Sequence, residues 1–324
     1  MAEGEILYLS RADVEAAGVD MGTVIALVED GFREKAAGRV EMPPKPGIHP
    51  QPDAFIHAMP AYIGKMRSAG MKWVGGHPGN PARGLPYISG LLILNDADTC
   101  LPYAVMDCTW ITGYRTAAAT AVAAKRLARP ESRTAGIVAC GFQGRTHLLA
   151  LSEVFRLTRA YAYDVNPDVQ RRFTADMSAV LGIDVVGVGR PREAIVASDL
   201  VVTSGPLLKH PTPTIPADWL QPGAFASAVD FDSYWTPEAL AQLDRMATDD
   251  HAQFRYYRGL GYFQRTPDPY ADLGELVGGS KPGRERADER TLAMNLGLAL
   301  EDMAVAPEVY RRARDRGLGT WLGL

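Results

Sequence analysis

Apolar segments that alternate with helical segments run through the second half of the chain after Pro130. Short runs such as TAGIVACG, RAYAYD, DVVGVG, LVVTSG and GAFASAVDF are typical of buried strands, and stretches such as PDVQRRFTADMSAVLG lie between them with helical spacing. Four or five apolar strands that alternate with helices predict βαβ units. We therefore expect a parallel, doubly wound sheet in this part of the chain.

The first part of the chain has a different pattern. Residues 5–9 predict an edge strand, and residues 13–36 carry apolar side chains at helical spacing. After a proline-rich loop, three β-rich segments, AFIHAMPAYI, GMKWVGG and YISGLLILND, are separated by Gly, Pro and Asn. These segments predict an α+β lobe with an antiparallel sheet.

The two patterns divide the chain into two domains. We place an α+β domain over residues 1–127, ending in an alanine-rich helix over 116–127, and a Rossmann-type domain over 128–297. The segment TLAMNLGLALEDMAVAPEVYRRARDRG predicts a long helix near the end, and we expect residues 298–324 to return to the first domain. The fold class is α/β with an α+β substrate-binding and dimerisation lobe.

Length, charge and cysteine content limit the classes of partner and the location that we expect for this protein. A length of 324 residues favours two cores, since single cores stop growing at about 250–300 residues. The formal charge of -4 argues against binding to nucleic acid or an anionic membrane, and no stretch approaches the about 20 apolar residues of a membrane span. The acidic N-terminal segment does not resemble a signal peptide, so we expect a cytoplasmic protein. Cys100, Cys108 and Cys140 form no CxxC pair, and no metal site is expected.

The segment GIVACGFQGRTHL indicates a dinucleotide-binding turn. In a GxGxxG turn the glycines allow the tight bend, the approach of a pyrophosphate and close packing of helix on strand. Here Gly141 and Gly144 are present, and Ala139 replaces the first glycine, which requires a negative φ at that alanine. Asp164 follows twenty residues after Gly144, where an acid would bind the ribose hydroxyls, so NAD is favoured over NADP. The alternative is that Asp164 only caps the helix that begins near Pro167.

Three cations of the first domain indicate an anionic ligand. Lys72 stands within the apolar strand GMKWV, where its ammonium must reach either water or a counter-charge. Arg115 precedes a run of small helical residues, where a cation opposes the helix dipole unless an anion is present. With Lys45 in PPKPG, these residues suggest a site for a substrate carboxylate.

Read together, these segments resemble the ornithine cyclodeaminase and mu-crystallin family. The resemblance spans nearly the whole chain and is carried by MKWVGGHPGNPARGLP, YRTAAATAVAAKRLA, ACGFQGR, AYDVNP, PGAFASAVDFDSYWTPEAL and GRERADERTLAMNLGLALED. It implies an NAD(P)-binding Rossmann lobe, an N-terminal lobe that forms a homodimer through its sheet, and an active site between the lobes.

The resemblance also implies roles for single residues. Asp232 falls on the acid/base position, although Asp230 stands where a glycine is usual and leaves the choice between the two acids open. The substrate positions are Lys45, His57, Lys72, Arg115 and Leu296, with Lys72 also close to the reacting carbon. The cofactor positions are Tyr87, Arg115, Gly141, Gln143, Gly144, Asp164, Thr203, Val229, Asp230 and Asn295.

Departures from the cyclodeaminase pattern concern the far end of the substrate. His57 replaces a glutamate suited to a terminal ammonium, Tyr87 replaces a threonine, and Thr236 replaces a lysine. Bulk at Tyr87 and Trp235 would change the volume of the site if both faced it. The alternative for His57 is a hydrogen-bonded residue of the sheet.

Three functions follow from this sequence. The first is an NAD-dependent amino-acid dehydrogenase or ketimine reductase acting on a small amino acid or its imine, with Asp232 and Lys72 as catalytic residues. The second is an ornithine-type cyclodeaminase that uses NAD catalytically and releases ammonia, and the third is a mu-crystallin-like binding protein. The substrate side chain, the direction of reaction and any assembly beyond a dimer stay open.

Overall fold

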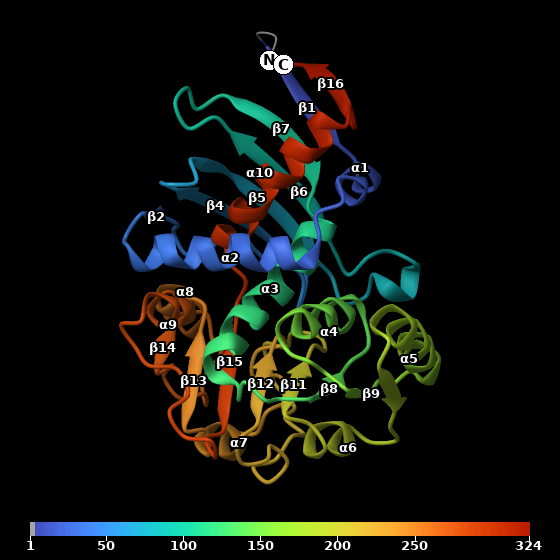
Figure 1. Ribbon diagram of the computed structural model, residues 1–324. Helices are drawn as coiled ribbons and strands as arrows, with labels where there is room; N and C mark the ends of the chain where they lie inside the picture. Colours follow the sequence, from blue (N-terminus) through green and yellow to red (C-terminus); the bar gives the residue numbers. More distant parts are fainter. Residues whose placement is uncertain (1–3) are drawn as a thin grey trace. The chain divides into compact units, whose positions relative to one another are not determined.

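The computed structural model describes residues 4–324 and divides into two compact units (Figure 1). Unit 1 runs to Arg115 and resumes at Gly297, and unit 2 is Thr116–Leu296. The division lies within helix α3 (Thr109–Leu127), whereas the boundary expected from the sequence lies at the end of that helix. Helix α3 also begins earlier than the alanine-rich run that predicted it.

Unit 1 contains a mixed sheet with the strand order β16-β1-β7-β6-β5-β4-β2, with β3 paired to β4. Its pairs are antiparallel except β1 with β7. The expectation that residues 5–9 form an edge strand is wrong, because the C-terminal strand β16 pairs on the outside of β1. The strands are β1 (Glu5–Leu9), β2 (Val40–Glu41), β3 (Gly47–Ile48), β4 (Phe55–Ile63), β5 (Ser68–Gly76), β6 (Ile88–Asn95), β7 (Pro102–Asp107) and β16 (Thr320–Gly323).

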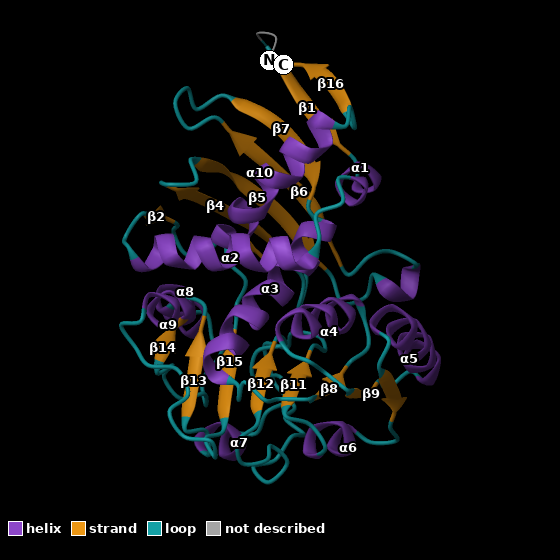
Figure 2. Cartoon of the chain, in the orientation of Figure 1, coloured by secondary structure: helices purple, strands orange, loops and turns teal. Residues whose placement is uncertain are grey.

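The helices of unit 1 cover one face of this sheet. Helix α10 (Ala299–Asp315) packs on β4, β5 and β6, and α2 (Met21–Ala36) packs on α10 and β4 (Figure 2). The single helix expected over residues 13–36 is two helices, since Gly18 adopts a φ of +65° after α1 (Arg11–Ala16) and Asp20 caps the start of α2. A short 3₁₀ turn, η1, covers Pro81–Arg83.

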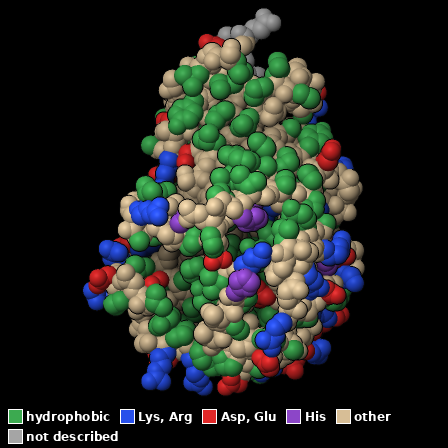
Figure 3. Space-filling model, turned by 180° about the vertical axis from the view of Figure 1, so that it is seen from behind, with side chains coloured by type: hydrophobic (Ala, Val, Ile, Leu, Met, Phe, Trp, Pro, Cys, Tyr) green, Lys and Arg blue, Asp and Glu red, His purple; other side chains and the backbone are tan. Residues whose placement is uncertain are grey.

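The other face of the unit 1 sheet carries apolar side chains. Along β5 the side chains of Lys72 and Val74 are buried, whereas Trp73 between them is 45% exposed. Its cross-strand neighbour on β6, Leu91, is 44% exposed. Tyr62 on β4 is also exposed, and the view in Figure 3 shows hydrophobic side chains gathered on this face. Unit 1 thus leaves one sheet face apolar and uncovered by its own helices.

Unit 2 contains an eight-stranded sheet in which every pair is parallel. Its order is β10-β9-β8-β11-β12-β15-β13-β14, so β9 and β10 are added on one side of β8 and β11 is added on the other, which makes the β8/β11 edge the topological switch point. Ligands of doubly wound folds bind outside the carboxyl ends of the strands at such a switch point. The strands are β8 (Thr134–Val138), β9 (Arg159–Tyr163), β10 (Asp184–Gly187), β11 (Leu200–Thr203), β12 (Phe225–Ala228), β13 (Arg245–Thr248), β14 (Ala271–Asp272) and β15 (Thr291–Met294).

Strand β15 corrects the expected C-terminal helix. The residues TLAM form this strand in the interior of the unit 2 sheet, and the helix of this region begins only at Ala299. An apolar run of this length fits either a strand or a buried helix, and pairing with β12 and β13 makes these residues a strand. The helices of unit 2 are α4 (Phe142–Val154), α5 (Pro167–Leu181), α6 (Pro191–Val196), α7 (Pro237–Ala241), α8 (His251–Gly259) and α9 (Leu273–Gly278). Among the described residues no helix is long and apolar enough to cross a bilayer.

Candidate active site

The turn between β8 and α4 has the geometry of a dinucleotide-binding loop. A Cβ added at Gly144 would lie 2.4 Å from the carbonyl oxygen of Ala139, so the last glycine allows the helix to pack closely on the strand. A Cβ at Gly141 would meet no atom within 4 Å, so this position faces open space at the first turn of α4. No side chain caps the helix there, which leaves its N–H groups for an anion.

The backbone of Ala139 differs from the one that we expected from the sequence. Its φ is +79°, in the left-handed region, whereas we expected a negative φ for an alanine there. The backbone thus has the shape that the first glycine normally allows, and the alanine adopts it with steric strain. The hydroxyl of Ser204 donates to the carbonyl oxygen of Ala139 at 3.1 Å and helps to hold this conformation.

Asp164 closes the same turn from the end of β9. Its carboxylate accepts hydrogen bonds from the backbone N–H groups of Cys140 and Asn166, each at 2.8 Å. The alternative that Asp164 caps helix α5 is wrong, since the side chain of Asn166 is the cap. Asp164 therefore joins the glycine turn to the next strand, and its half-buried side chain reaches the edge where a ribose would lie.

Three of the predicted site residues in unit 2 carry buried polar atoms that have no hydrogen-bond partner among the described residues. These atoms are Oε1 of Gln143, Oδ1 of Asp232, and both Oδ1 and Nδ2 of Asn295, which is only 4% exposed. A buried polar atom that is not hydrogen-bonded costs free energy, so such atoms are candidates for contact with a bound ligand or a water molecule. Together with the open position at Gly141, they fit a bound dinucleotide.

The two acids after β12 have different surroundings. Both oxygens of Asp230 accept internal hydrogen bonds, from the Thr203 hydroxyl at 2.7 Å and from the N–H of Gly205 at 2.9 Å. Asp232 accepts one bond, from the Thr266 hydroxyl at 2.9 Å, through Oδ2. Burial raises the pKa of Asp230 to about 7, against these bonds, and burial also raises the pKa of Asp232. Of the two acids, only Asp232 has a carboxylate oxygen that accepts no hydrogen bond from a described residue.

Other predicted site residues of unit 2 make hydrogen bonds or packing contacts within the unit. The Thr203 hydroxyl donates to Asp230 and accepts from the indole N–H of Trp235 at 3.1 Å. Trp235 is 1% exposed within the hydrophobic core of the unit, which leaves its ring no role in the volume of a site. The N–H of Val229 bonds to the backbone of Thr203, and the N–H of Leu296 donates to Asp249 at 2.7 Å.

The three cations of unit 1 are all buried. The Lys72 ammonium is 0% exposed and contacts Asp302 at 2.6 Å, which excludes a solvent-facing lysine. Arg115 binds both Glu301, at 2.5 Å, and Asp302, at 3.1 Å. The ammonium of Lys45 donates to the backbone oxygen of Gly297 at 2.9 Å.

Sequence reasoning missed Glu301 and Asp302, the two acids that contact the predicted site residues Lys72 and Arg115. They lie on α10, in the segment LALEDMAVA, where two adjacent acids interrupt an apolar helical run. Both are fully buried, although charged residues seldom are unless paired. The signal was therefore available, since acids in so apolar a run require buried cations as partners.

His57 faces the same interior of unit 1 from β4. Burial, together with the charges of Lys45 and Lys72, lowers its pKa to about 3, so the imidazole is neutral at physiological pH. Its ring stacks on that of Phe55, with the ring centroids 4.3 Å apart. Tyr87 is half-buried in the loop before β6, and its backbone oxygen accepts from the N–H of His77 at 3.0 Å.

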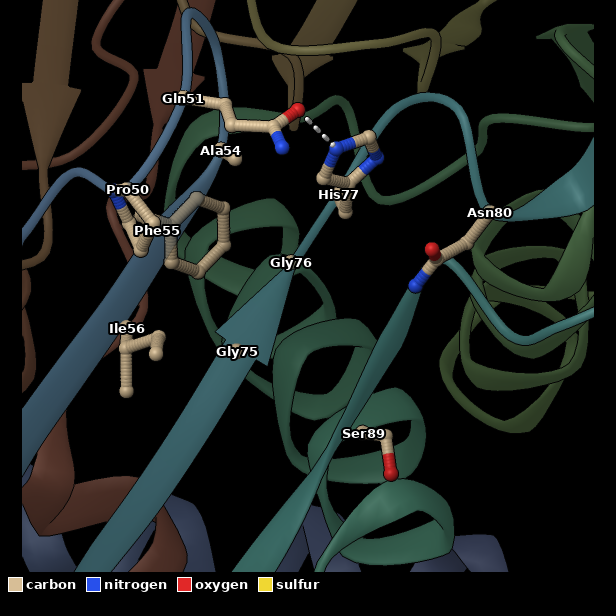
Figure 4. Close-up of a pocket in the computed structure, with 10 residues that line it drawn as sticks. All are labelled: Pro50, Gln51, Ala54, Phe55, Ile56, Gly75, Gly76, His77, Asn80 and Ser89. Atoms are coloured by element: carbon tan, nitrogen blue, oxygen red, sulfur yellow. Dashed lines mark hydrogen bonds between the residues drawn. The ribbon is translucent and has the colours of Figure 1, made fainter.

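A cavity of about 280 Å³ lies at the ends of β4, β5 and β6 in unit 1, and Phe55 is part of its lining (Figure 4). In it the ring of His77 contacts the side-chain oxygen of Gln51 at 3.0 Å. Its lining contains no Lys, Arg, Asp or Glu side chain and none of the predicted site residues. We therefore do not assign the substrate carboxylate to this cavity.

One cluster has the composition of a metal site. The side chains of His251, Asp272 and Glu275 place one ligand atom each within 4.8 Å of one another. Asp272 and Glu275 form the capping box of α9, and His251 contacts Glu275 at 3.0 Å. The capping of helix α9 therefore explains why these three side chains lie close together, without a metal ion.

The model of the ornithine cyclodeaminase/mu-crystallin family matches residues 5–317. The chain belongs to this family. The resemblance inferred from the sequence motifs and the α/β fold class are thereby confirmed.

Several of the similar proteins are dehydrogenases or reductases by name, and others are cyclodeaminases. Alanine dehydrogenase of Archaeoglobus fulgidus is 35% identical over 324 aligned residues, which cover 98% of each chain. A structure of Thermococcus litoralis Delta(1)-pyrroline-2-carboxylate reductase with NADH and L-proline has a TM-score of 0.88 at 33% identity, covering 97% of this chain and 99% of that one. An archaeal alanine dehydrogenase dimer with bound NAD has a TM-score of 0.87 at 33% identity and covers 99% of each chain.

The strain at Ala139 leads to a first prediction. Ala139→Gly should stabilise the protein by about 0.5–1 kcal/mol, because relief of the left-handed alanine outweighs the added flexibility of the unfolded chain. Denaturant unfolding measures the difference. The control is Ala135→Gly in β8, where φ is not positive and the same change should destabilise. Equal effects of the two substitutions would contradict the strain.

The raised pKa of Asp230 predicts a pH dependence of stability. The folded protein holds this proton more tightly than the unfolded chain, so the stabilisation is complete below the unfolded value of 3.8 and is lost as the pH rises through about 7. Asp230→Asn cannot ionise, so its stability relative to wild type should rise as the pH increases from about 4 to about 7 and stay constant above, with a total gain of a few kcal/mol at about 1.4 kcal/mol per pKa unit.

Unfolding free energies of both proteins across that range test the pH dependence. Asp199→Asn serves as the control, because hydrogen bonds to the backbone N–H groups of Arg133 and Thr134 help to hold the pKa of Asp199 low, against burial. Its difference from wild type should stay constant over the same range. A constant difference for Asp230→Asn would contradict the raised pKa.

Proposed function

We propose that the chain is an NAD-dependent oxidoreductase that acts on a small amino acid or its imine, as an amino-acid dehydrogenase or ketimine reductase. The observation that carries the proposal is the buried pair formed by Lys72 and Arg115. Both cations contact the same oxygen of Asp302, at 2.7 and 3.1 Å, which keeps an ammonium and a guanidinium side by side in the interior of unit 1. A pair of this kind suits a substrate carboxylate, and Lys45 adds a third buried cation.

Unit 2 has the features for the cofactor. Bound NAD would supply the acceptor for the hydride that leaves the α-carbon of an amino acid. The N–H groups at the start of α4, with Gly141 and Gly144, would bind its pyrophosphate, and Asp164 its ribose hydroxyls. Gln143 and Asn295 would meet it with their unpartnered polar atoms. Tyr87, Arg115, Thr203, Val229 and Asp230 complete the proposed set of cofactor residues, in which Thr203 and Asp230 shape the loop.

Asp232 is the proposed acid/base residue. A catalytic acid needs an oxygen that can reach the substrate and a pKa near the working pH. Asp232 has a raised pKa and a buried Oδ1 that has no hydrogen-bond partner among the described residues, whereas both oxygens of Asp230 accept hydrogen bonds, from Thr203 and Gly205. Asp232 would take a proton from the substrate nitrogen or an attacking water and return it in the reverse direction. Lys72 would stabilise the charge that develops beside it.

His57 favours a dehydrogenase or reductase over a cyclodeaminase. A cyclodeaminase must hold the terminal ammonium of a diamine, and the neutral imidazole of His57 lacks the negative charge of the glutamate that it replaces. The stacked ring of Phe55 adds an apolar neighbour. We therefore propose a substrate with a small side chain, with His57 and Leu296 among the residues that bind it.

The exposed sheet face of unit 1 supports a homodimer. Trp73 and Leu91 are neighbours across β5 and β6, and both are nearly half exposed on a face that the helices of unit 1 leave uncovered. Contiguous exposed apolar side chains of this kind mark protein interfaces. We propose that a second copy of the chain covers this face.

A substrate panel tests the proposed activity. The purified protein is assayed for NADH formation with L-alanine and L-proline, and for NADH oxidation with pyruvate plus ammonia and with Delta(1)-pyrroline-2-carboxylate. We expect turnover of at least one amino-acid and imine pair, and a loss of kcat by about 10²–10⁴-fold in Asp232→Asn with unchanged NADH affinity. The control is Asp184→Asn, which alters an exposed ion pair with Arg159 in the same unit.

L-ornithine with NAD, added to the panel, separates the alternatives. L-ornithine converted to proline and ammonia without net NADH would replace the proposal by a cyclodeaminase. NADH binding with no turnover of any compound would favour a mu-crystallin-like binding protein. Full activity in Asp232→Asn would remove the acid/base role and return the question to Asp230.

The dimer has its own test. The molar mass from light scattering should be twice that of one chain for wild type, and should fall to that of one chain when Trp73→Glu and Leu91→Glu are combined, because two charges would be buried without partners. Val180→Glu, at an exposed position on α5, is the control and should leave the mass unchanged. A monomeric wild type would contradict the proposal.

A further inference from the structure

Helix α10 places two adjacent carboxylates, Glu301 and Asp302, in the interior of unit 1. Both side chains are 0% exposed, and both contact cations from other elements. Neither is among the residues that we assign to substrate or cofactor. Burial of a charge costs free energy, so the presence of two fully buried acids on one helix requires an explanation.

The contacts of the two acids differ. Asp302 lies 2.7 and 2.6 Å from the Lys72 ammonium through its two oxygens, and it accepts from Nε of Arg115 at 3.1 Å. Glu301 accepts from Arg115 alone, at 2.5 Å through Oε2, and its Oε1 has no partner among the described residues. Asp302 therefore connects β5 to α3, and Glu301 fixes only the end of the guanidinium.

On the basis of the proposed function, we propose that Asp302, with Glu301 beside it, is a positioning residue that holds Lys72 and Arg115 charged and adjacent for the substrate carboxylate. The acid need not contact substrate. It fixes the distance between the two cations, so that binding does not have to bring them together. A substrate carboxylate would then meet two preorganised donors.

The surroundings of Lys72 explain why a counter-charge is needed. Burial and the charge of Arg115 lower its pKa, and Asp302 raises it. The other titratable or charged groups that face it are Cys108 before α3, Glu301 on α10 and His57 on β4. The hydroxyl of Thr112 lies 3.3 Å from the ammonium. Loss of the Asp302 charge would therefore make Lys72 give up its proton at a lower pH.

The test compares three isosteric variants of α10. Asp302→Asn should raise KM for the amino or imino acid by roughly 30-fold or more, as expected for truncation of a buried charge pair, and should move the alkaline limb of kcat/KM to lower pH. Glu301→Gln should raise KM less. Glu308→Gln is the matched control, since Glu308 pairs with Arg311 and Arg312 on the same helix and should leave both quantities unchanged.

NADH affinity, measured by fluorescence, separates positioning from misfolding, and it should be unchanged in all three variants. If Asp302→Asn does not bind NADH, Glu301→Gln carries the test with the same readouts. A KM and an alkaline limb equal to those of Glu308→Gln would overturn the proposal. A merely structural role would lower stability without moving the alkaline limb.

The proposal is separable from the proposed function. If wild type turns over no compound of the panel, the proposed function fails, and the titration of Lys72 decides the positioning role instead. NMR of protein labelled with 13C at lysine Cε, assigned with Lys72→Arg, follows that titration. Lys72 should titrate at lower pH in Asp302→Asn than in Glu308→Gln, and equal titrations would overturn the proposal.

Discussion

The contact between the Asp302 carboxylate and two buried cations is the interaction on which unit 1 depends. Alternation along β5 turns Trp73 outward and therefore directs Lys72 into the interior, where its ammonium needs a counter-charge. Helix α10 must then start close to the sheet. Gly297 makes this possible, because a Cβ there would lie 2.6 Å from the Arg115 guanidinium. The contact between Asp302 and the two cations, the start of α10 and the alternation along β5 thus depend on one another.

Unit 2 shows a comparable constraint at the ends of its strands. Ala139 after β8 and Phe231 after β12 both have positive φ, at +79° and +61°, although neither is glycine. Such conformations persist only where neighbouring contacts hold them, and they concentrate at functional sites. Here they flank the glycine turn and the acids Asp230 and Asp232. The surrounding hydrogen bonds hold the backbone in a shape that the residues themselves disfavour.

Sequence reasoning reached the family and the α/β class because these depend on local patterns. The βαβ alternation and the glycine turn can be read along the chain, and they indicated the parallel sheet and the cofactor. It missed what depends on distant partners: strand β16 beside β1, the strand at TLAM, and the acids that neutralise Lys72 and Arg115. For the two strands the deciding neighbour lies far away in sequence, so periodicity near the residue could not identify it. The two acids were visible as an interruption of an apolar helical run, but which cations they contact depends on distant segments.

The insertion of unit 2 between the two parts of unit 1 also affects the order of folding. Unit 2 is one continuous segment, Thr116–Leu296, and its parallel sheet can form as soon as that segment has been synthesised. Unit 1 has to wait for α10 and β16. Until then the ammonium of Lys72 lacks the counter-charge of Asp302 and would stay in water. The interior of unit 1 between the sheet and α10 therefore cannot form. On the ribosome, the lobe that begins the chain would thus be the last to become native.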